Sequence, residues 1–156
     1  MRPSSLESAR AFLGARRIAV VGVSRDEKDF SRAVLRELAK RGHDVVPVNP
    51  ALAEAEGLRG FARVQDVSPP ADAAILMTPP SRTEGAVRDC LAAGIRRVWL
   101  HRGAGAGAAT PAALALCAES GIEVVQGLCP FMALADASFP HRLHHFLRRR
   151  FARAAP

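Results

Sequence analysis

Five short apolar runs recur along the chain, separated by longer stretches in which apolar and polar residues are mixed. In the first run the apolar residues are continuous rather than alternating, which is typical of a strand covered on both faces of a parallel sheet. The first run is also rich in β-branched residues, which favour strands. We therefore predict strands over residues 18–23, 45–48, 73–77, 97–100 and 122–125.

Two of the intervening stretches begin with the Ser-x-x-Glu spacing of a helix capping box. Ser4 with Glu7 predicts a lead-in helix that reaches about Leu13, and Ser81 with Glu84 predicts a helix between the third and fourth strands. The first motif stands directly before an apolar stretch, which a helix would turn toward the core.

Two further helices are predicted from their periodicity and their end signals. Residues 31–41 place their apolar positions on one face and are followed by Gly42, a common residue just past a helix end. Thr110 and Pro111 suit the N-cap and the first helical position of a helix that runs to Ser120.

Strands that alternate with helices at this spacing predict a five-stranded, parallel, doubly wound sheet with helices on both faces. This is a Rossmann-like α/β fold, and 156 residues suit a single domain. Pro47 lies inside the second strand and has no N–H to donate, so we expect that strand near an edge or an irregularity. Residues 49–70 predict a short crossover turn rather than a full helix.

The cysteine content argues against a disulfide framework and against a structural zinc site. Cys90, Cys117 and Cys129 are odd in number and share no C-x-x-C spacing. No apolar run approaches the roughly 20 residues that span a membrane. The N-terminus lacks the apolar segment of a secretory signal, so we expect a cytoplasmic protein.

The net charge of +7 favours anionic partners, and much of it lies near the C-terminus. Residues 139–151 predict an amphipathic helix with a basic face. Nucleic acid is one possible partner for such a segment, but it is short and no nucleic-acid-binding motif accompanies it. Packing against the domain, or against a second subunit in a homodimer, is the simpler interpretation.

The segment after the first strand has the features of a phosphate site. Ligands of open α/β sheets bind beyond the carboxyl ends of the strands. Gly22 allows close backbone approach, Ser24 offers a hydroxyl, and the next helix points its N-terminus at the same place. Arg25 and Lys28 add positive charge, as does Arg32. The alternative is that Gly22 only makes a tight turn between strand and helix.

Two departures count against an ordinary nicotinamide dehydrogenase. The segment after the first strand contains no G-x-G-x-x-G motif, and the second strand ends in Asn49 and Pro50. A conventional NAD site has an acidic residue there for the ribose hydroxyl. A loosely held NAD, or another ADP-containing nucleotide, stays open as a ligand.

Four short segments, each after or within a predicted strand, resemble successive motifs of the CoA-binding domain family. They are residues 20–24, 46–50 and 77–80, and residues 98–100 together with Gly103. This family is similar to the N-terminal domain of the succinyl-CoA synthetase α subunit. The resemblance divides the chain into an N-terminal helix over 1–16, a CoA-binding domain over 17–129 and a basic extension over 130–156.

The resemblance implies a role for each matched segment. Gly22 and Ser24 would meet the phosphates, and residues 49–50 would line the crevice after the second strand. Residues 78–80 would flank the adenine or the start of the pantetheine arm, and Gly103 would form part of the last wall. The predicted ligand contacts are Gly22, Val23, Ser24, Arg25, Lys28, Ser31, Asn49, Pro50, Thr78, Pro79, Pro80, His101 and Gly103.

Cys129 and His101 are the two residues with reactive side chains near this predicted site. The ending around Cys129 resembles one branch of the family, and the thiol could form a mixed disulfide with CoA if a basic neighbour lowered its pKa. A buried structural cysteine is the favoured interpretation. His101 follows the fourth strand but does not match the active histidine of the synthetase, so we treat it as a ligand neighbour.

The sequence therefore predicts a CoA-binding or acyl-CoA-binding module with an accessory or regulatory role and no catalytic or metal-binding residues. We expect no second domain of the kind that carries the ligase chemistry of the synthetase. One alternative is a regulatory domain that binds NAD or another nucleotide. A weaker alternative is an enzyme that acts on acyl thioesters through Cys129 or His101.

Overall fold

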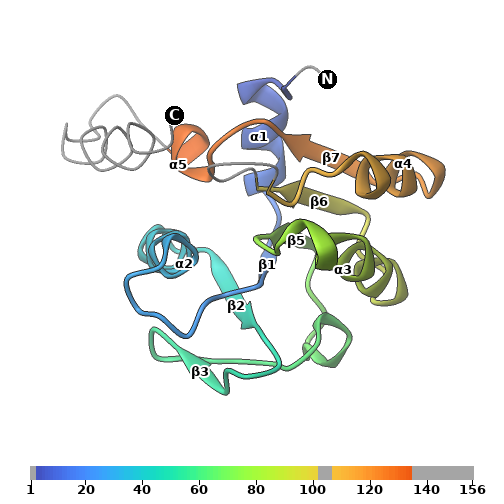
Figure 1. Ribbon diagram of the computed structural model, residues 1–156. Coiled ribbons are helices and arrows are strands. Elements are labelled where there is room, and N and C mark those ends of the chain that lie inside the picture. Colours follow the sequence, from blue (N-terminus) through green and yellow to red (C-terminus); the bar gives the residue numbers. More distant parts are fainter. Residues whose placement is uncertain (1–2, 102–106, 135–156) are drawn as a thin grey trace, which may run out of the picture.

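The computed structural model describes residues 3–101 and 107–134, and the predicted strands come together in one sheet (Figure 1). All neighbouring strands of this sheet run parallel. Each strand lies within two residues of the predicted bounds. The strands are β1 (Arg17–Val21), β2 (Asp44–Val48), β5 (Ala73–Leu76), β6 (Arg97–Leu100) and β7 (Glu123–Gln126).

The sheet is covered on both faces, which confirms the predicted Rossmann-like, doubly wound fold. Its strand order is β2-β1-β5-β6-β7. Alternate strand residues enter two separate cores: Ile18 and Val20 pack on one face and Ala19 on the other. The first face is covered by α1 (Leu6–Leu13), α2 (Phe30–Lys40) and α5 (Pro130–Leu134), and the second by α3 (Pro80–Ala92) and α4 (Pro111–Glu119) (Figure 1).

Trp99, in β6, is the largest fully buried side chain. Its indole N–H donates to the carbonyl of Leu128 at 3.1 Å, which satisfies the one polar group of the ring. Phe12 of α1 meets the indole edge-on, with ring centroids 5.5 Å apart. The N-terminal helix and the segment after β7 are therefore held on the same core.

The expected place of Pro47 near an edge is confirmed, because β2 is an outer strand of the sheet. The carbonyl of Pro47 accepts a hydrogen bond from the N–H of Phe61 at 3.0 Å, and the N–H of Asn49 donates to the carbonyl of Phe61. The segment around Phe61 thus covers part of the outer side of β2. On that side, the absent N–H of Pro47 costs the sheet no hydrogen bond.

The stretch between β2 and β5 contains a small hairpin that the sequence analysis did not predict. It consists of β3 (Glu54–Ala55) and β4 (Leu58–Arg59) and is followed by a 3-10 turn, η1 (Val64–Asp66). Glu56 and Gly57 at its tip both have positive φ, 54° and 74°. This matches the two-residue turn that suits the twist of a hairpin. As predicted, the stretch contains no full helix.

The capping box predicted at Ser4 is wrong by one residue. Ser5 is the N-cap of α1 and accepts a hydrogen bond from the N–H of Ser8. Ser4 instead lies along the outer strand β7: its N–H donates to Gln126 O at 2.9 Å, and its hydroxyl bonds Val124 O and Gln126 N. Ser4 therefore closes part of an exposed sheet edge, which protects against unwanted strand pairing.

The other predicted helix starts have mixed outcomes. The N-cap of α3 is Pro79, and Pro80 is its first residue, so the capping box predicted at Ser81 is also wrong. The cap predicted for α4 is confirmed, because the Thr110 hydroxyl accepts from the N–H of Ala113 at 3.1 Å. The helix predicted over residues 139–151 lies outside the described residues. Within 3–101 and 107–134, no helix combines the length and apolarity needed to cross a bilayer.

Candidate functional site

The carboxyl ends of the strands lie at one level, so the segments that follow them share an edge of the sheet. Val21 is in register with Val48 of β2 and with Leu76 of β5, and Leu76 is in register with Leu100 of β6. The chain moves from β1 to β2 on one side and returns to β5 on the other, which makes the β1–β5 boundary the point where ligands usually bind. The residues that come next at this edge are Gly22, Asn49, Met77 and His101.

Gly22 is required by packing at this boundary as well as by the turn. Its φ is 90°, and a Cβ on it would lie 2.9 Å from the carbonyl oxygen of Met77. Its N–H donates to Val48 O at 2.9 Å. The glycine thus brings the end of β1 against the peptides of both neighbouring strands, and any larger side chain would push β5 away.

The loop between β1 and α2 is shaped by its own polar side chains. The N–H of Ser24 donates to the Ser31 hydroxyl at 2.9 Å, and that hydroxyl donates to Asp29 Oδ1 at 2.6 Å. The Ser24 hydroxyl accepts from the N–H of Asp26. Asp29 also caps α2 by accepting from the N–H of Ser31 at 2.8 Å. Ser24 and Ser31 therefore hold the loop in shape, and the amide of Ser31 is already used within the protein.

The basic residues predicted around this loop divide into two groups. Arg25 and Lys28 are exposed and free to reach a ligand from the loop. Arg32 is buried instead: its Nε donates to Glu56 Oε1 at 2.7 Å and its Nη1 to the carbonyl of Ser24 at 3.2 Å. Arg32 therefore fastens the loop to the tip of the β3–β4 hairpin.

Glu56 is the partner of two arginines. Arg36 Nη1 also reaches Glu56 Oε1, at 3.1 Å, and donates to the carbonyl of Glu27. Hydrogen bonds from Arg32 and then Arg36 hold the pKa of the Glu56 carboxyl below its usual value, so it stays ionised. Sequence reasoning missed Glu56 because its partners lie in another element and no local spacing connects them.

Asn49 clamps the loops that follow β1 and β2. Its Nδ2 donates to the carbonyl of the buried Val23 at 2.7 Å, and its Oδ1 accepts from the N–H of Ala51 at 2.8 Å. The amide is therefore committed to fixing the relative position of the two loops. Pro50 beside it is exposed to solvent.

The segment after β5 leads directly into α3. The Thr78 and Thr83 hydroxyls are 2.9 Å apart, and the Thr83 hydroxyl donates to the carbonyl of Pro79 at 3.2 Å. Pro79 and Pro80 are exposed and begin the helix. The proline pair thus marks the start of a helix at the same edge of the sheet.

His101 lies in a cluster of aromatic rings at the end of β6. Its imidazole stacks on Phe30, the first residue of α2, with centroids 5.0 Å apart and planes at 22°. Phe131 of α5 lies 5.4 Å from the same phenyl ring. Burial lowers the pKa of His101 to about 4, so the ring is neutral at physiological pH. Gly103, the last predicted contact, lies outside the described residues.

Cys129 does not have the lowered pKa that a redox role would need. Burial raises the pKa of its thiol, and the backbone N–H groups of Phe131 and Met132 offset only part of that effect. The condition for the mixed-disulfide hypothesis, a basic neighbour that lowers this pKa, is not met among the described residues, and the burial fits the favoured interpretation of a structural cysteine. Cys90 and Cys117 are buried as free thiols, and burial raises their pKa values to about 12 and about 11. Within the described residues, no group of three or more His, Cys, Asp or Glu side chains is placed to bind a metal.

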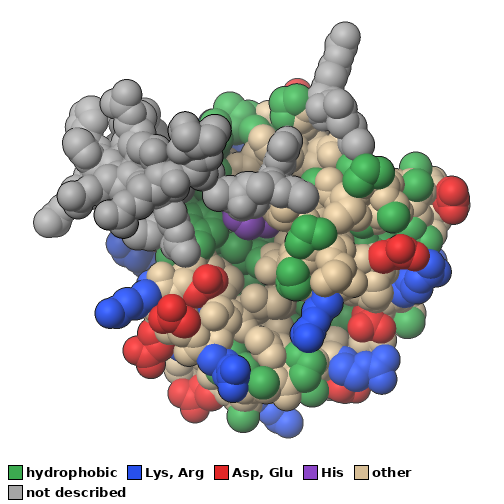
Figure 2. Space-filling model, in the orientation of Figure 1, with side chains coloured by type: hydrophobic (Ala, Val, Ile, Leu, Met, Phe, Trp, Pro, Cys, Tyr) green, Lys and Arg blue, Asp and Glu red, His purple; other side chains and the backbone are tan. Residues whose placement is uncertain are grey.

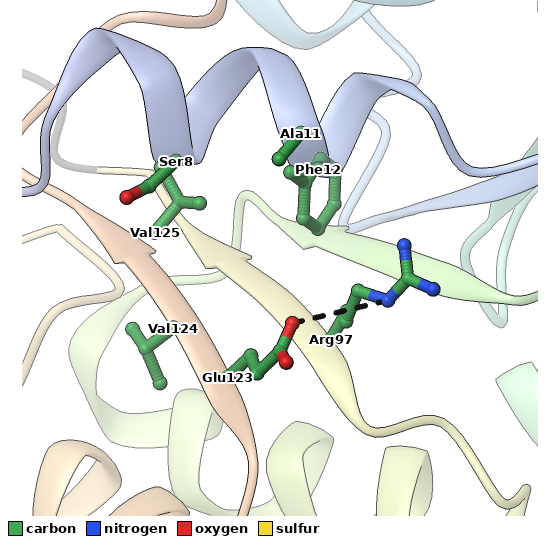
Figure 3. Close-up of a pocket in the computed structure, with 7 residues that line it drawn as sticks. All are labelled: Ser8, Ala11, Phe12, Arg97, Glu123, Val124 and Val125. Carbon is green, nitrogen blue, oxygen red and sulfur yellow. Dashed lines mark ion pairs between the residues drawn. The ribbon is translucent and has the colours of Figure 1, made fainter.

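A separate pocket of about 410 Å³ lies at the opposite edge of the sheet (Figure 3). Phe12 and Ser8 of α1 form one side of it. Arg97 and Glu123, which begin β6 and β7, form the other, with Arg97 Nε 3.9 Å from Glu123 Oε2. Because it lies at the amino ends of the strands, this pocket is distinct from the carboxyl edge, where the predicted site residues lie.

Comparison with known proteins points to one family. A family model described as a CoA binding domain matches residues 16–135 of the chain. Among curated proteins, the uncharacterized protein YneT of Bacillus subtilis is 26% identical over 127 residues, which cover 81% of this chain and 91% of YneT.

Two further relatives extend the comparison. The alpha subunit of the ADP-forming acetate–CoA ligase II of Pyrococcus furiosus is 30% identical over 88 residues, or 56% of this chain. The matched part is only 19% of that subunit. Among solved structures, a Thermus thermophilus protein (cell-free ID.343) superposes with a TM-score of 0.74 at 30% identity, covering 84% of this chain and 97% of that one.

Proposed function

We propose that this chain, which belongs to the CoA-binding domain family, binds CoA or an acyl-CoA along the carboxyl edge of its sheet and acts as an accessory or regulatory module rather than as an enzyme. The ligand is expected to lie across the β1–β5 boundary, where open α/β sheets bind their ligands. The matched segment of the acetate–CoA ligase subunit shows that such a domain also occurs as part of a larger chain.

The observation that carries this proposal is the way Asn49 joins the loops after β1 and β2. Its hydrogen bonds to Val23 and Ala51 give both loops one fixed geometry at the boundary. Arg25 and Lys28 extend from the first loop into solvent. A preformed edge with free positive charge suits a ligand that carries several phosphates.

The same residue disfavours NAD as the ligand. A dinucleotide site of the usual kind presents a carboxylate after the second strand to the ribose hydroxyls. Here the position is an amide, and both of its polar atoms are already bonded within the protein. A phosphorylated ribose, as in CoA, meets no negative charge from Asn49.

The crevice also lacks the pairing that covalent catalysis requires, as far as the described residues extend. A nucleophile is activated by a base within hydrogen-bond distance. The Cys129 thiol has a raised pKa, and no hydrogen bond joins it to the imidazole of His101 among the described contacts. The raised pKa of the Cys129 thiol favours a binding role over an acyl-thioester enzyme that uses this cysteine.

Calorimetric titration of the nucleotide-stripped protein with CoA, dephospho-CoA, NAD and ADP, at one stated salt concentration, tests the proposal. We expect CoA to bind most tightly and dephospho-CoA more weakly, because it has lost the 3′-phosphate. Tighter binding of NAD would replace the proposal with a nucleotide-sensing role. In a separate assay, release of free CoA from acetyl-CoA incubated with the protein would show that the protein is an enzyme.

A further inference from the structure

The ring cluster at the end of β6 joins three elements of the fold. Phe30 begins α2, His101 follows β6, and Phe131 belongs to α5. The backbone fixes the histidine, because its N–H donates to Leu76 O at 3.0 Å and its carbonyl accepts from the N–H of Ala108 at 2.9 Å. The imidazole is therefore held in place by the sheet and by the stacked phenyl ring.

The two ring nitrogens of His101 differ in their surroundings. Nδ1 is buried and has no hydrogen-bond partner, whereas Nε2 is not among the buried unpartnered atoms of the described residues. A buried N–H without an acceptor is rarer in native proteins than an acceptor without a donor. The single proton of the neutral ring is therefore assigned to Nε2, which makes Nε2–H the hydrogen-bond donor of this ring.

Polarity changes along the crevice from β2 to β6. The β2 end carries the charged groups of the first loop and the hairpin, among them Lys28, Arg36 and Glu56. Figure 2 shows charged side chains of both signs in this region, over α2 and β3. The β6 end has the aromatic cluster, and the half-buried Met77 and Cys129, which follow β5 and β7, pack on the same hydrophobic core. A ligand with a charged end and an apolar end can therefore bind in only one favourable direction.

We propose that the Phe30–His101–Phe131 cluster receives the acyl group of an acyl-CoA, and that His101 Nε2–H donates a hydrogen bond to the thioester carbonyl. The class of ligand is then a CoA thioester of a short, uncharged acyl group. This inference rests on the proposed function, because the nucleotide end must occupy the β1–β2 side for the acyl group to reach β6.

The surroundings of His101 explain why the acyl group should carry no charge. The ring is neutral, since burial lowers its pKa to about 4 in spite of the nearby Asp29 carboxylate, and the phenyl ring of Phe30 stacks on it. A carboxylate placed there would lose water without gaining a counter-charge, which is costly. An alkyl group placed there carries no such desolvation cost, and each buried methylene favours binding.

The test compares the affinities of CoA, butyryl-CoA and succinyl-CoA, measured by calorimetry for the wild-type protein and two variants. We expect wild type to bind butyryl-CoA about tenfold more tightly than CoA, and succinyl-CoA more weakly than butyryl-CoA. His101→Phe keeps a stacked ring but removes the donor, so it should weaken butyryl-CoA about tenfold and change CoA little. The matched control is His43→Phe, at the opposite edge just before β2, which should leave all three affinities unchanged.

Two results separate this inference from the proposed function. Equal affinities for CoA and both thioesters, unchanged by His101→Phe, would overturn the inference while leaving CoA binding intact; no binding of any CoA compound would remove both. If His101→Phe fails to fold, nitrogen NMR of the wild-type imidazole tests the proposed hydrogen bond instead. Butyryl-CoA should shift the His101 Nε2 signal more than CoA does, and an unchanged signal would contradict the proposed hydrogen bond.

Discussion

Several polar side chains at the carboxyl edge are already hydrogen-bonded within the protein. Ser24 and Ser31 shape the first loop, and Asn49 joins it to the second. The exposed side chains of Arg25 and Lys28 are then the groups of this loop that stay free for phosphates. We infer that polar residues of the loop preorganise the crevice, and that charge at its rim supplies attraction for the ligand.

His101 should make the stability of the protein depend on pH. Its pKa is about 4 in the folded state and 6.5 in its ordinary state, so the unfolded chain binds more protons between these values. Lowering the pH through this window therefore favours unfolding. With these two pKa values, the difference in proton binding lowers the free energy of unfolding by about 2 kcal/mol between pH 7 and pH 5.

Urea unfolding of wild type and His101→Phe at pH 7 and pH 5 measures this effect. The variant should lose distinctly less stability than wild type between the two pH values. His43→Phe is the matched control. Burial and then the charge of Arg41 lower the pKa of His43 too, so this variant shows the effect of removing a different histidine, and it should keep more of the pH dependence than His101→Phe. An identical pH dependence in wild type and His101→Phe would show that the imidazole is not held neutral.

At the scale of elements, the predictable parts are those set by local pattern. The five strands follow from short, mainly apolar runs, and the start of α4 follows from Thr110 and Pro111, because cap and helix are neighbours in the chain. The β3–β4 hairpin was missed because its turn begins with Glu56 rather than with the asparagine or aspartate that usually marks such a turn. Ser4 was assigned to a cap because nothing local reveals that β7 lies beside it.

The hairpin should depend on the buried contact between Arg32 and Glu56. Glu56→Gln leaves the guanidinium of Arg32, only 7% exposed, without a counter-charge, so we expect a loss of about 3 kcal/mol in the free energy of unfolding. The matched control is Glu84→Gln in the exposed Glu84–Arg88 pair of α3, which should cost less than about 1 kcal/mol.

Urea unfolding of both variants provides the measurement, with CoA affinity as a second readout. Because Arg32 also donates to the carbonyl of Ser24, Glu56→Gln should weaken CoA binding along with stability. If the two variants lost equal stability, the Arg32–Glu56 pair would be no more than an ordinary surface ion pair.

At the scale of the whole molecule, strand order decides where the site lies. The order β2-β1-β5-β6-β7 brings four segments that are distant in the sequence to one edge. The sequence predicted these segments because each follows a strand, and the fold class told us that such ends converge. It did not show that Gly22 packs on Met77 or that Phe30 stacks on His101, because both contacts depend on which strands and helices become neighbours.

The central claim is that CoA binds at the carboxyl edge, and amide NMR during a CoA titration tests it most directly. The largest shifts should come from the segments after β1, β2, β5 and β6, including Ser24, Asn49 and Thr78. Ser8 and Glu123, in the pocket at the amino edge, should change little. Shifts that instead concentrate around Ser8 and Glu123, or that are absent at saturating CoA, would contradict the claim.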